Sequence, residues 1–497
     1  MTALPAGGSS GVIAALEGLI HQAEQLTIGT VLAADVAGIR ERLGRPLRVA
    51  IAGRTKAGKS TLLNALVGER LAATDATECT RIVTWYRYDL GYSVTARLRS
   101  GESRALNFDR GDGSLQVRLG SLGVAEIDRI EVGWPSSRLA NLTLIDTPGL
   151  DSSTPGTSDR TLEALVGAEP GAGEADAVVY LMRHLHRRDT EFLEAFDRPM
   201  AAASPVNAVG LLSRADEIGA GRTDALESAG SIAQRYSSDP RVTGLVLTVL
   251  PLAGLLAETG GSLREDEVRA LRRIAALDEA VLDALLLSVD RFRSRPENPL
   301  PADSREALLG RLGLYGLRLA VFSLRDQAGL TSADLARRLV DVSGIRQVEA
   351  LLRRQFADRA DALKARSALA ALGVVAGAAK RSSVEGVDDL VAGIERVEAS
   401  SRQLAELRVL HLVHAGIVTL TDDERAEVDR LLATGSTAER LGRPVGTGAH
   451  ELRPVALAAI ERWRTKAAHP LLDRPAVEVA EAVARSYEGV YEELTRI

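Results

Sequence analysis

The chain has 497 residues, of which 45% are hydrophobic, so it is long enough for roughly two to four domains and can bury a substantial core. Its formal net charge of -6 excludes the strongly basic composition typical of nucleic-acid-binding proteins. The single cysteine, Cys79, excludes an internal disulfide and indicates a reducing cytoplasm. The N-terminus lacks the basic region of a signal peptide, and no apolar run is expected to cross a bilayer, the longest being residues 367–379.

Two helices are predicted before the first strand. Apolar residues recur at helical spacing from residue 12 to 23 and again from 31 to 43, and Gly-Arg-Pro at 44–46 ends the segment. We therefore assign residues 1–45 to N-terminal helices that pack into a neck.

Between residues 46 and 260, short β-branched runs alternate with helical stretches. The predicted strands are residues 47–52, 82–88, 142–145, 177–182, 208–212 and 245–250. This alternation is typical of βαβ units and predicts an α/β domain with a mostly parallel sheet flanked by helices. An insertion at about 91–133 holds further alternating segments that we expect to extend the sheet, at 93–98, 115–119 and 130–132.

No strand is predicted in residues 261–497, which we assign to an all-α neck and trunk. Apolar stripes predict one helix over 271–292, another over 345–363 and a last one over 479–494. We expect the helix after Glu265 and the last helix to pack with the N-terminal helices into a shared neck, because two short helices cannot bury their apolar faces alone.

A phosphate-binding motif follows the first predicted strand. Residues 53–60, Gly-Arg-Thr-Lys-Ala-Gly-Lys-Ser, match GxxxxGK[ST] in full and open a predicted helix, as a P-loop requires. Its backbone N–H groups would cradle phosphates, Lys59 would neutralise the β- and γ-phosphates, and Ser60 would ligate Mg²⁺. The residues predicted to bind the nucleotide here are Gly53, Thr55, Lys56, Ala57, Gly58, Lys59, Ser60 and Thr61. The Lys56 cation could touch the transferring phosphoryl group, or it could face solvent or a partner subunit.

Two further segments complete the expected Mg²⁺ and γ-phosphate site. The sequence Asp-Thr-Pro-Gly at 146–149 ends a predicted strand and is typical of switch II of a GTPase, with Asp146 in the Mg²⁺ shell and the Gly149 N–H near the γ-phosphate. The polar segment 74–81 lies where switch I is expected. Thr80 is predicted to ligate Mg²⁺ and help orient the attacking water, with Thr77 as the alternative.

The base-reading loop is predicted at Ser213-Arg214-Ala215-Asp216, after another strand. Asp216 would accept hydrogen bonds from guanine, Arg214 would stack on the base, and Ser213 is shorter than the residue usual in GTPases. A surface turn with an incidental aspartate is the alternative. Ala253 belongs to a second loop that could contact the base.

Taken in order, the motifs GRTKAGKS, TDATECTR, DTPG and SRADE resemble those of the dynamin superfamily. More narrowly, the chain is similar to the actinobacterial isoniazid-inducible dynamin-like GTPases, and among these to the shorter, C-type member. The resemblance implies a GTPase head on a helical neck and trunk that binds GTP or GDP with Mg²⁺. It also implies a cytoplasmic protein, peripheral at the inner face of the plasma membrane, that acts in envelope or drug stress.

The resemblance further implies self-association through the GTPase head or hetero-association with a longer dynamin-like protein, possible contact with anionic lipid, and no nucleic-acid partner. The basic segment 353–366 is interpreted first as a solvated helix face, and contact with anionic lipid is the more specific alternative.

Some positions depart from the family pattern. Thr55 stands where dynamins commonly carry a glutamine that positions the attacking water, and no hydrophobic membrane paddle is visible. The alternatives to a membrane-remodelling GTPase are therefore a regulatory GTPase partner of a longer dynamin-like protein, a soluble non-membrane GTPase serving ribosome or RNA assembly, and an ATPase.

Overall fold

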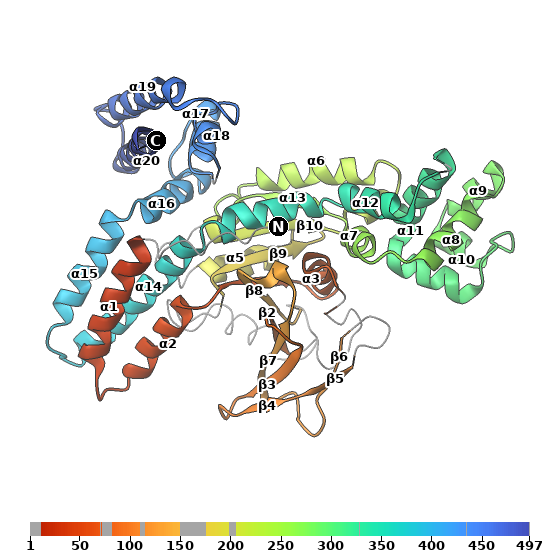
Figure 1. Ribbon diagram of the computed structural model, residues 1–497, viewed down its shortest axis with the longest axis horizontal. Helices are drawn as coiled ribbons and strands as arrows, with labels where there is room; N and C mark the ends of the chain where they lie inside the picture. Colours follow the sequence, from red (N-terminus) through yellow and green to blue (C-terminus); the bar gives the residue numbers. More distant parts are fainter. Residues whose placement is uncertain are drawn as a thin grey trace.

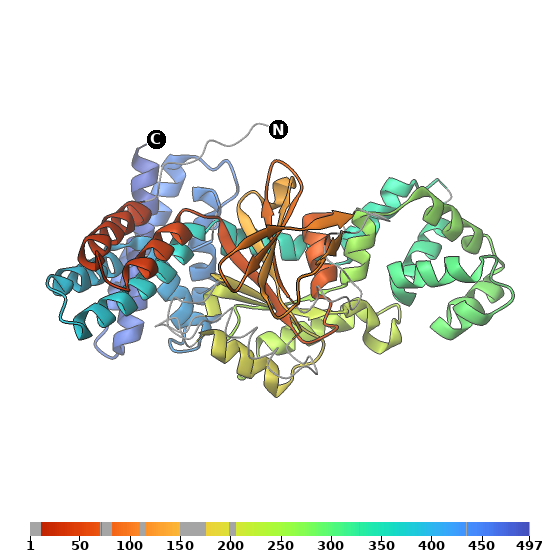
Figure 2. The same ribbon diagram turned by 90° about the horizontal axis from the view of Figure 1, so that it is seen from below.

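A computed structural model describes residues 11–69, 71, 82–109, 115–149, 175–197, 205–327, 329–433 and 435–496. An α/β domain occupies the middle of an elongated molecule, and helical lobes lie at both ends (Figure 1). The same division is seen after a quarter turn (Figure 2).

The central sheet has nine strands in the order β11-β10-β9-β1-β8-β2-β7-β3-β4. Their bounds are β1 Leu47–Gly53, β2 Val83–Tyr88, β3 Ser93–Leu98, β4 Ser103–Ala105, β7 Ile127–Trp134, β8 Leu142–Asp146, β9 Ala177–Met182, β10 Ala208–Ser213 and β11 Val249–Leu252. The five strands from β11 to β8 are parallel, whereas β2 runs antiparallel to β8. Strands β1, β9 and β10 are buried along their whole length, which explains their continuous apolar runs. The expected mostly parallel α/β fold is confirmed.

Two strand predictions need correction. Residues 115–119 do not extend the main sheet, because β6 (Gln116–Arg118) pairs with β5 (Asn107–Asp109) in a separate two-stranded sheet. Strand β11 begins at Val249 rather than 245, because the Leu245 and Val246 amides both donate to the Val242 carbonyl in a turn, and only from Leu247 on does the backbone bond to β10.

Helices cover both faces of the sheet. They are α3 Lys59–Val67, α5 Arg187–Asp197, α6 Ala225–Ser237, α7 Gly254–Gly261 and α13 Ile345–Leu352, with the 3-10 turns η3 Ser137–Leu139, η4 Pro205–Asn207 and η5 Ala215–Ala220. Ile345 and Val348 of α13 belong to the same apolar core as β1 and α3. A segment from the C-terminal half of the chain therefore completes the core of the nucleotide domain.

The first helical lobe lies beside α7. It consists of α8 Glu265–Ala275, α9 Glu279–Leu286, α10 Val289–Ser294, α11 Ala302–Asp326 and α12 Ser332–Val342, which share one apolar core. The stripe predicted as a single helix over 271–292 is split among α8, α9 and α10. The chain breaks at N-caps between them: Asp278 precedes α9, and the Ser288 hydroxyl accepts from the Arg291 amide at the start of α10.

The second group of helices lies on the opposite side of the nucleotide domain (Figure 1). It consists of α1 Gly11–Thr27, α2 Ala33–Leu43, the π-helical turn η6 Arg353–Ala357, α14 Ala360–Arg381, α15 Val387–Ser400, α16 Arg402–His414, α17 Asp422–Leu431, α18 Thr437–Arg440, α19 Ala449–Ala467 and α20 Arg474–Thr495. The last predicted helix is confirmed as α20. The helix predicted over 345–363 is instead α13, η6 and the start of α14.

The predicted shared neck is wrong. Helices α1 and α2 pack on α14 and α15, whereas α20 packs on α19 and α16, and α8 packs on α11. The alanine-rich face of α14, which includes Ala365, Ala368 and Ala371, lets α1 and α2 approach closely. The N-terminal helices therefore have a partner in the C-terminal region, but it is not the C-terminal helix.

Two described helices, α11 and α14, are long and apolar enough to cross a membrane by length and composition, contrary to the expectation from the sequence. In α11, 50% of the apolar window is buried inside the protein, and in α14 the figure is 56%. Both helices supply residues to the cores of their lobes, as core helices of a folded domain do.

Candidate functional site

The phosphate loop joins the carboxyl end of β1 to the start of α3, as the motif predicts. Lys59 is buried, and its Nζ donates to the carbonyl oxygens of Gly53 at 3.1 Å and Arg54 at 3.2 Å. Gly58, with φ of 97°, is the N-cap of α3. The loop thus curls around the Lys59 ammonium at the positive end of a helix, which is an arrangement for binding phosphate.

The other residues of this loop differ in exposure. Thr55 and Lys56 are exposed, Ala57 is buried, and Ser60 and Thr61 are half-buried. Lys56 has left-handed backbone geometry, with φ of 61°, and its side chain has no partner among the residues that the structure describes. The Lys56 ammonium is therefore accessible at the rim of the loop, where a phosphoryl group or a partner subunit could meet it.

Ser60 and Asp146 meet below the phosphate loop. The Ser60 hydroxyl donates to Asp146 Oδ2 at 3.5 Å, while the enclosed Oδ1 atom accepts no hydrogen bond from the described residues. Burial raises the pKa of Asp146 to about 6, although the Lys59 charge and the Ser60 hydrogen bond act in the opposite direction. A carboxylate oxygen left without a donor beside a hydroxyl is a donor set that suits Mg²⁺. The residues present therefore fit the metal.

The start of switch II is pressed against the phosphate loop. A Cβ at Gly149 would lie 2.4 Å from Thr55 Oγ1 and 2.8 Å from Thr55 Cα, so only glycine fits there. The buried Thr147 hydroxyl donates to the Ile51 carbonyl at 3.0 Å and fixes the turn on β1. Any movement of Gly149 is thereby coupled to Thr55.

The base-reading loop follows β10. Arg214 has φ of 54°, and its guanidinium donates to the Lys56 carbonyl at 3.0 Å and to Glu217 Oε1 at 2.7 Å. The Ser213 hydroxyl donates to the Met182 carbonyl at 3.3 Å inside the sheet. The Ser213 hydroxyl thus links β10 to β9, and its predicted contact with the base stays a prediction, whereas Arg214 ties the base loop to the phosphate loop.

Asp216 is enclosed by the first helical lobe. It is only 4% exposed, and burial raises its pKa to about 6. Gly313 interrupts α11 with φ of 63° and ψ of -179°, and a Cβ there would lie 3.4 Å from Asp216 Oδ2. This contact was not predicted from the sequence, although a glycine inside an apolar helical pattern can indicate a break in the helix. For the Asp216 carboxylate to hydrogen-bond a base, α11 must either move away from it or form one side of the base site.

Ala253, predicted to belong to a second base-contacting loop, lies at the turn between β11 and α7. Ala253 is fully buried, and its amide donates to the Ser343 carbonyl at 2.9 Å. That N–H is therefore already used to hold the turn before α13. The predicted switch I residues 74–81, with Thr77 and Thr80, lie outside the described residues.

A phosphate loop, a DTPG turn and a base loop at the carboxyl ends of β1, β8 and β10 define a P-loop nucleotide-binding domain of the GTPase type. Residues 49–191 match the model of the Dynamin family. The chain is 40% identical over 463 residues to "Isoniazid-induced protein IniC" of Mycobacterium tuberculosis, which covers 92% of each chain. It belongs to the dynamin family, as a bacterial dynamin-like protein similar to the isoniazid-induced proteins.

Two other matches have lower sequence identity to this chain. "Isoniazid-induced protein IniA" of Mycobacterium tuberculosis is 27% identical over 325 residues, which is 64% of this chain and 48% of that one. A solved structure described as "An oligomerised bacterial dynamin pair provides a mechanism for the long-range sensing and tethering of membranes" aligns with 99% of this chain and 87% of its own, at 13% identity and a TM-score of 0.35.

Proposed function

We propose that this protein is a Mg²⁺-dependent GTPase that couples GTP hydrolysis to membrane association or remodelling during envelope or drug stress, at the cytoplasmic face of the plasma membrane. Membership of the dynamin family, whose members are GTPases, supports the nucleotide and the reaction. The observation that carries the proposal is the link from Arg214 to the Lys56 carbonyl, because it joins a base-reading loop to a phosphate loop in one site.

In this proposal each residue has a defined task. Lys59 neutralises phosphate charge, and Asp216 accepts from the guanine ring. Ser60 and Asp146 would hold Mg²⁺, which would withdraw charge from the phosphates. Gly149 contacts Thr55, so a switch II that closes on the γ-phosphate would press on the phosphate loop.

The membrane role is tested with liposomes. Purified full-length protein is incubated with GTP, Mg²⁺ and vesicles that contain phosphatidylglycerol, and tubulation or fission is scored by electron microscopy. The proposal expects remodelling with GTP and none with the Lys59→Ala variant. Remodelling that is equal with and without GTP would contradict the coupling, and co-sedimentation with ribosomes in place of vesicles would support a soluble GTPase instead.

A second candidate is a regulatory GTPase that heteromerises with a longer dynamin-like protein. The specific observation is Thr55, an exposed residue at the position where dynamins commonly carry a water-positioning glutamine. The longer relative of which this chain covers 48% of the length supports the same candidate. Remodelling that requires both proteins together, with slow hydrolysis by this chain alone, would favour it.

A further inference from the structure

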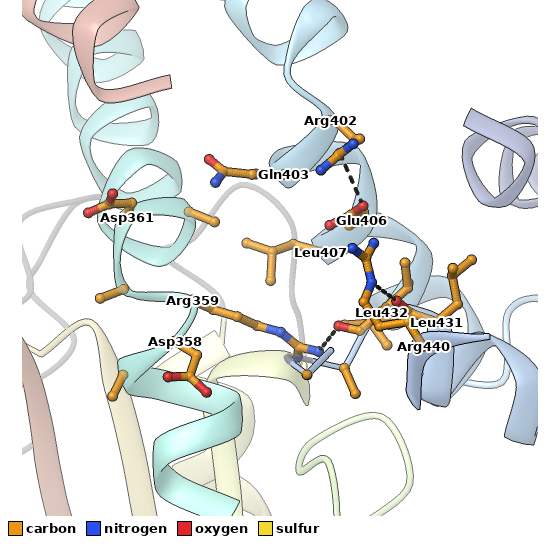
Figure 3. Close-up of a pocket in the computed structure, with 16 residues that line it drawn as sticks. Asp358, Arg359, Asp361, Arg402, Gln403, Glu406, Leu407, Leu431, Leu432 and Arg440 are labelled. Carbon is orange, nitrogen blue, oxygen red and sulfur yellow. Dashed lines mark hydrogen bonds and ion pairs between the residues drawn. The ribbon is translucent and has the colours of Figure 1, made fainter. Parts of the chain in front are cut away.

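A cavity separate from the nucleotide site lies among the C-terminal helices. Its volume is about 470 Å³, within the range of roughly 300–1,000 Å³ usual for ligand pockets. Every residue that lines it lies between Ala357 and Arg440, so the nucleotide domain contributes none. It forms where the start of α14 faces α16 and the loop between α17 and α18 (Figure 3).

Three arginines from three different elements line this cavity (Figure 3). Arg359 lies between the π-helical turn η6 and α14, Arg402 begins α16, and Arg440 ends α18. Single π-helical turns inside helical segments are frequent at functional sites. Here the turn separates α13 from α14, and Arg359, which follows it, is half-buried in the lining of the cavity rather than on the solvated face expected for this basic segment.

Arg359 lacks a direct counter-ion. Its guanidinium donates to the Leu432 carbonyl at 2.7 Å and to the side-chain oxygen of Gln355, and both acceptors are neutral. Among the described residues it makes no ion pair, and only two of the five N–H donors of a guanidinium are used. Burial lowers the pKa of Arg359, and the charges of Glu406, Asp429 and Asp358 act in the opposite direction. A half-buried cation is therefore left with free donors.

The acidic residues of the cavity are already engaged or lie to one side. Glu406 accepts from the Ser486 hydroxyl at 2.9 Å and pairs with Arg402 at 3.5 Å. Asp358 and Asp361 lie on the α14 side of the cavity, the side from which Arg359 enters, and away from Arg402 and Arg440 (Figure 3).

Arg402 and Arg440 both pair with the carboxylate of Glu493, and Arg402 pairs with Glu406 as well. They approach Glu493 at 3.7 Å and 3.4 Å respectively, and Arg440 also donates to the Leu431 carbonyl at 3.0 Å. Long, shared ion pairs of this kind leave guanidinium donors available to a stronger acceptor.

We propose that this cavity is a second ligand site that binds a phosphate-bearing anion through Arg359, Arg402 and Arg440. The planar fork of a guanidinium matches the oxygens of a phosphate, and three forks on three elements suit one polyvalent anion. Arg359 and Arg440 also donate to carbonyls at the end of α17, but that role uses only part of their donors. A bound anion links α14 to α16 and α18, and so joins the lobe that holds α1 and α2 to the C-terminal lobe. Its source is either a soluble phosphate compound or a lipid headgroup.

The test uses the full chain with Lys59→Ala, so that the phosphate loop does not compete for the probe. Inorganic pyrophosphate is titrated by calorimetry, and vesicles of phosphatidylcholine, with or without phosphatidylglycerol, are tested by co-sedimentation. Arg359→Gln and Arg402→Gln are added separately. The matched control is Arg354→Gln, an exposed arginine of the same π-helical turn that does not line the cavity.

We expect saturable pyrophosphate binding. Its affinity should fall about tenfold or more in each cavity variant, which corresponds to the loss of a charge-assisted hydrogen bond, and it should be unchanged in Arg354→Gln. If soluble anion does not bind, phosphatidylglycerol-dependent sedimentation that is lost in the cavity variants and kept in the control identifies a headgroup. Arg402 is 45% exposed, so Arg402→Gln remains informative if Arg359→Gln fails to fold. Binding that is absent for every probe, or equal in all variants, overturns the proposal.

Discussion

Replacing Asp146 with asparagine is expected to stabilise the nucleotide-free protein at neutral pH and to remove its response to Mg²⁺. Burial raises the pKa of Asp146 from 3.8 to about 6, so the folded protein holds this proton more tightly than the unfolded chain does. That contribution to stability is fully present below pH 3.8 and is lost as the pH rises through about 6. The pKa difference between the folded and unfolded states corresponds to about 3 kcal/mol of unfolding free energy. This is an upper limit, because Asp146 is partly accessible and solvent screens its charge. Asparagine carries no charge and avoids this loss.

The assay is urea unfolding of the wild type and Asp146→Asn at about pH 5 and about pH 8. The variant should be the more stable protein at the higher pH, and the difference should shrink at the lower pH, where the wild-type carboxyl is protonated. With saturating GDP, added Mg²⁺ should raise the stability of the wild type but not that of the variant.

Asp216→Asn is the matched control for this prediction. Burial also raises the pKa of Asp216 to about 6, but this residue lies at the base end of the site. The control should gain stability at the higher pH and keep its Mg²⁺ response when xanthosine diphosphate is the nucleotide. The reasoning is refuted if Asp146→Asn is no more stable than the wild type at the higher pH, or if its Mg²⁺ response survives.

Three other predictions follow from the same contacts. Asp216→Asn should weaken GTP binding and improve binding of xanthosine triphosphate, because an amide can donate to the extra xanthine carbonyl; unchanged selectivity in calorimetry would contradict the role of Asp216. Gly149→Ala should keep nucleotide binding but lower turnover, because its Cβ would collide with Thr55 at 2.4 Å; normal steady-state phosphate release would count against the coupling. Deleting residues 475–497 should leave hydrogen exchange of α1 and α2 unchanged, because these helices belong to the core with α14 and α15; lost protection there would restore the shared neck.

The nucleotide domain could be predicted well from the sequence because its signals are local. The phosphate loop and the DTPG turn follow buried strands directly, and β1, β9 and β10 are buried along their whole length, so their runs of apolar residues are unbroken. The segment predicted to read the base does follow β10, and Ser60 and Asp146 lie together beside the Lys59 loop, while the roles assigned to these residues stay predictions.

The helical region could not be predicted in the same way because helix partners are chosen over long distances. An apolar stripe shows that a helix buries one face, but it does not show against which helix. Helices α1 and α20 both have such a stripe, but α1 packs on α14 and α15 whereas α20 packs on α19 and α16. The enclosure of Asp216 by α11 has the same origin, since about a hundred residues separate Asp216 from Gly313.

The most direct test of the central claim is phosphate release by the purified full-length chain, measured with GTP and with ATP in parallel and repeated for Lys59→Ala. Lys59 is the buried cation of the phosphate loop, held by the Gly53 and Arg54 carbonyls. A dynamin-family GTPase built on this loop should release phosphate from GTP in a Mg²⁺-dependent way, leave ATP intact, and lose the activity in the variant. Equal hydrolysis of ATP, or full activity of Lys59→Ala, would contradict the account.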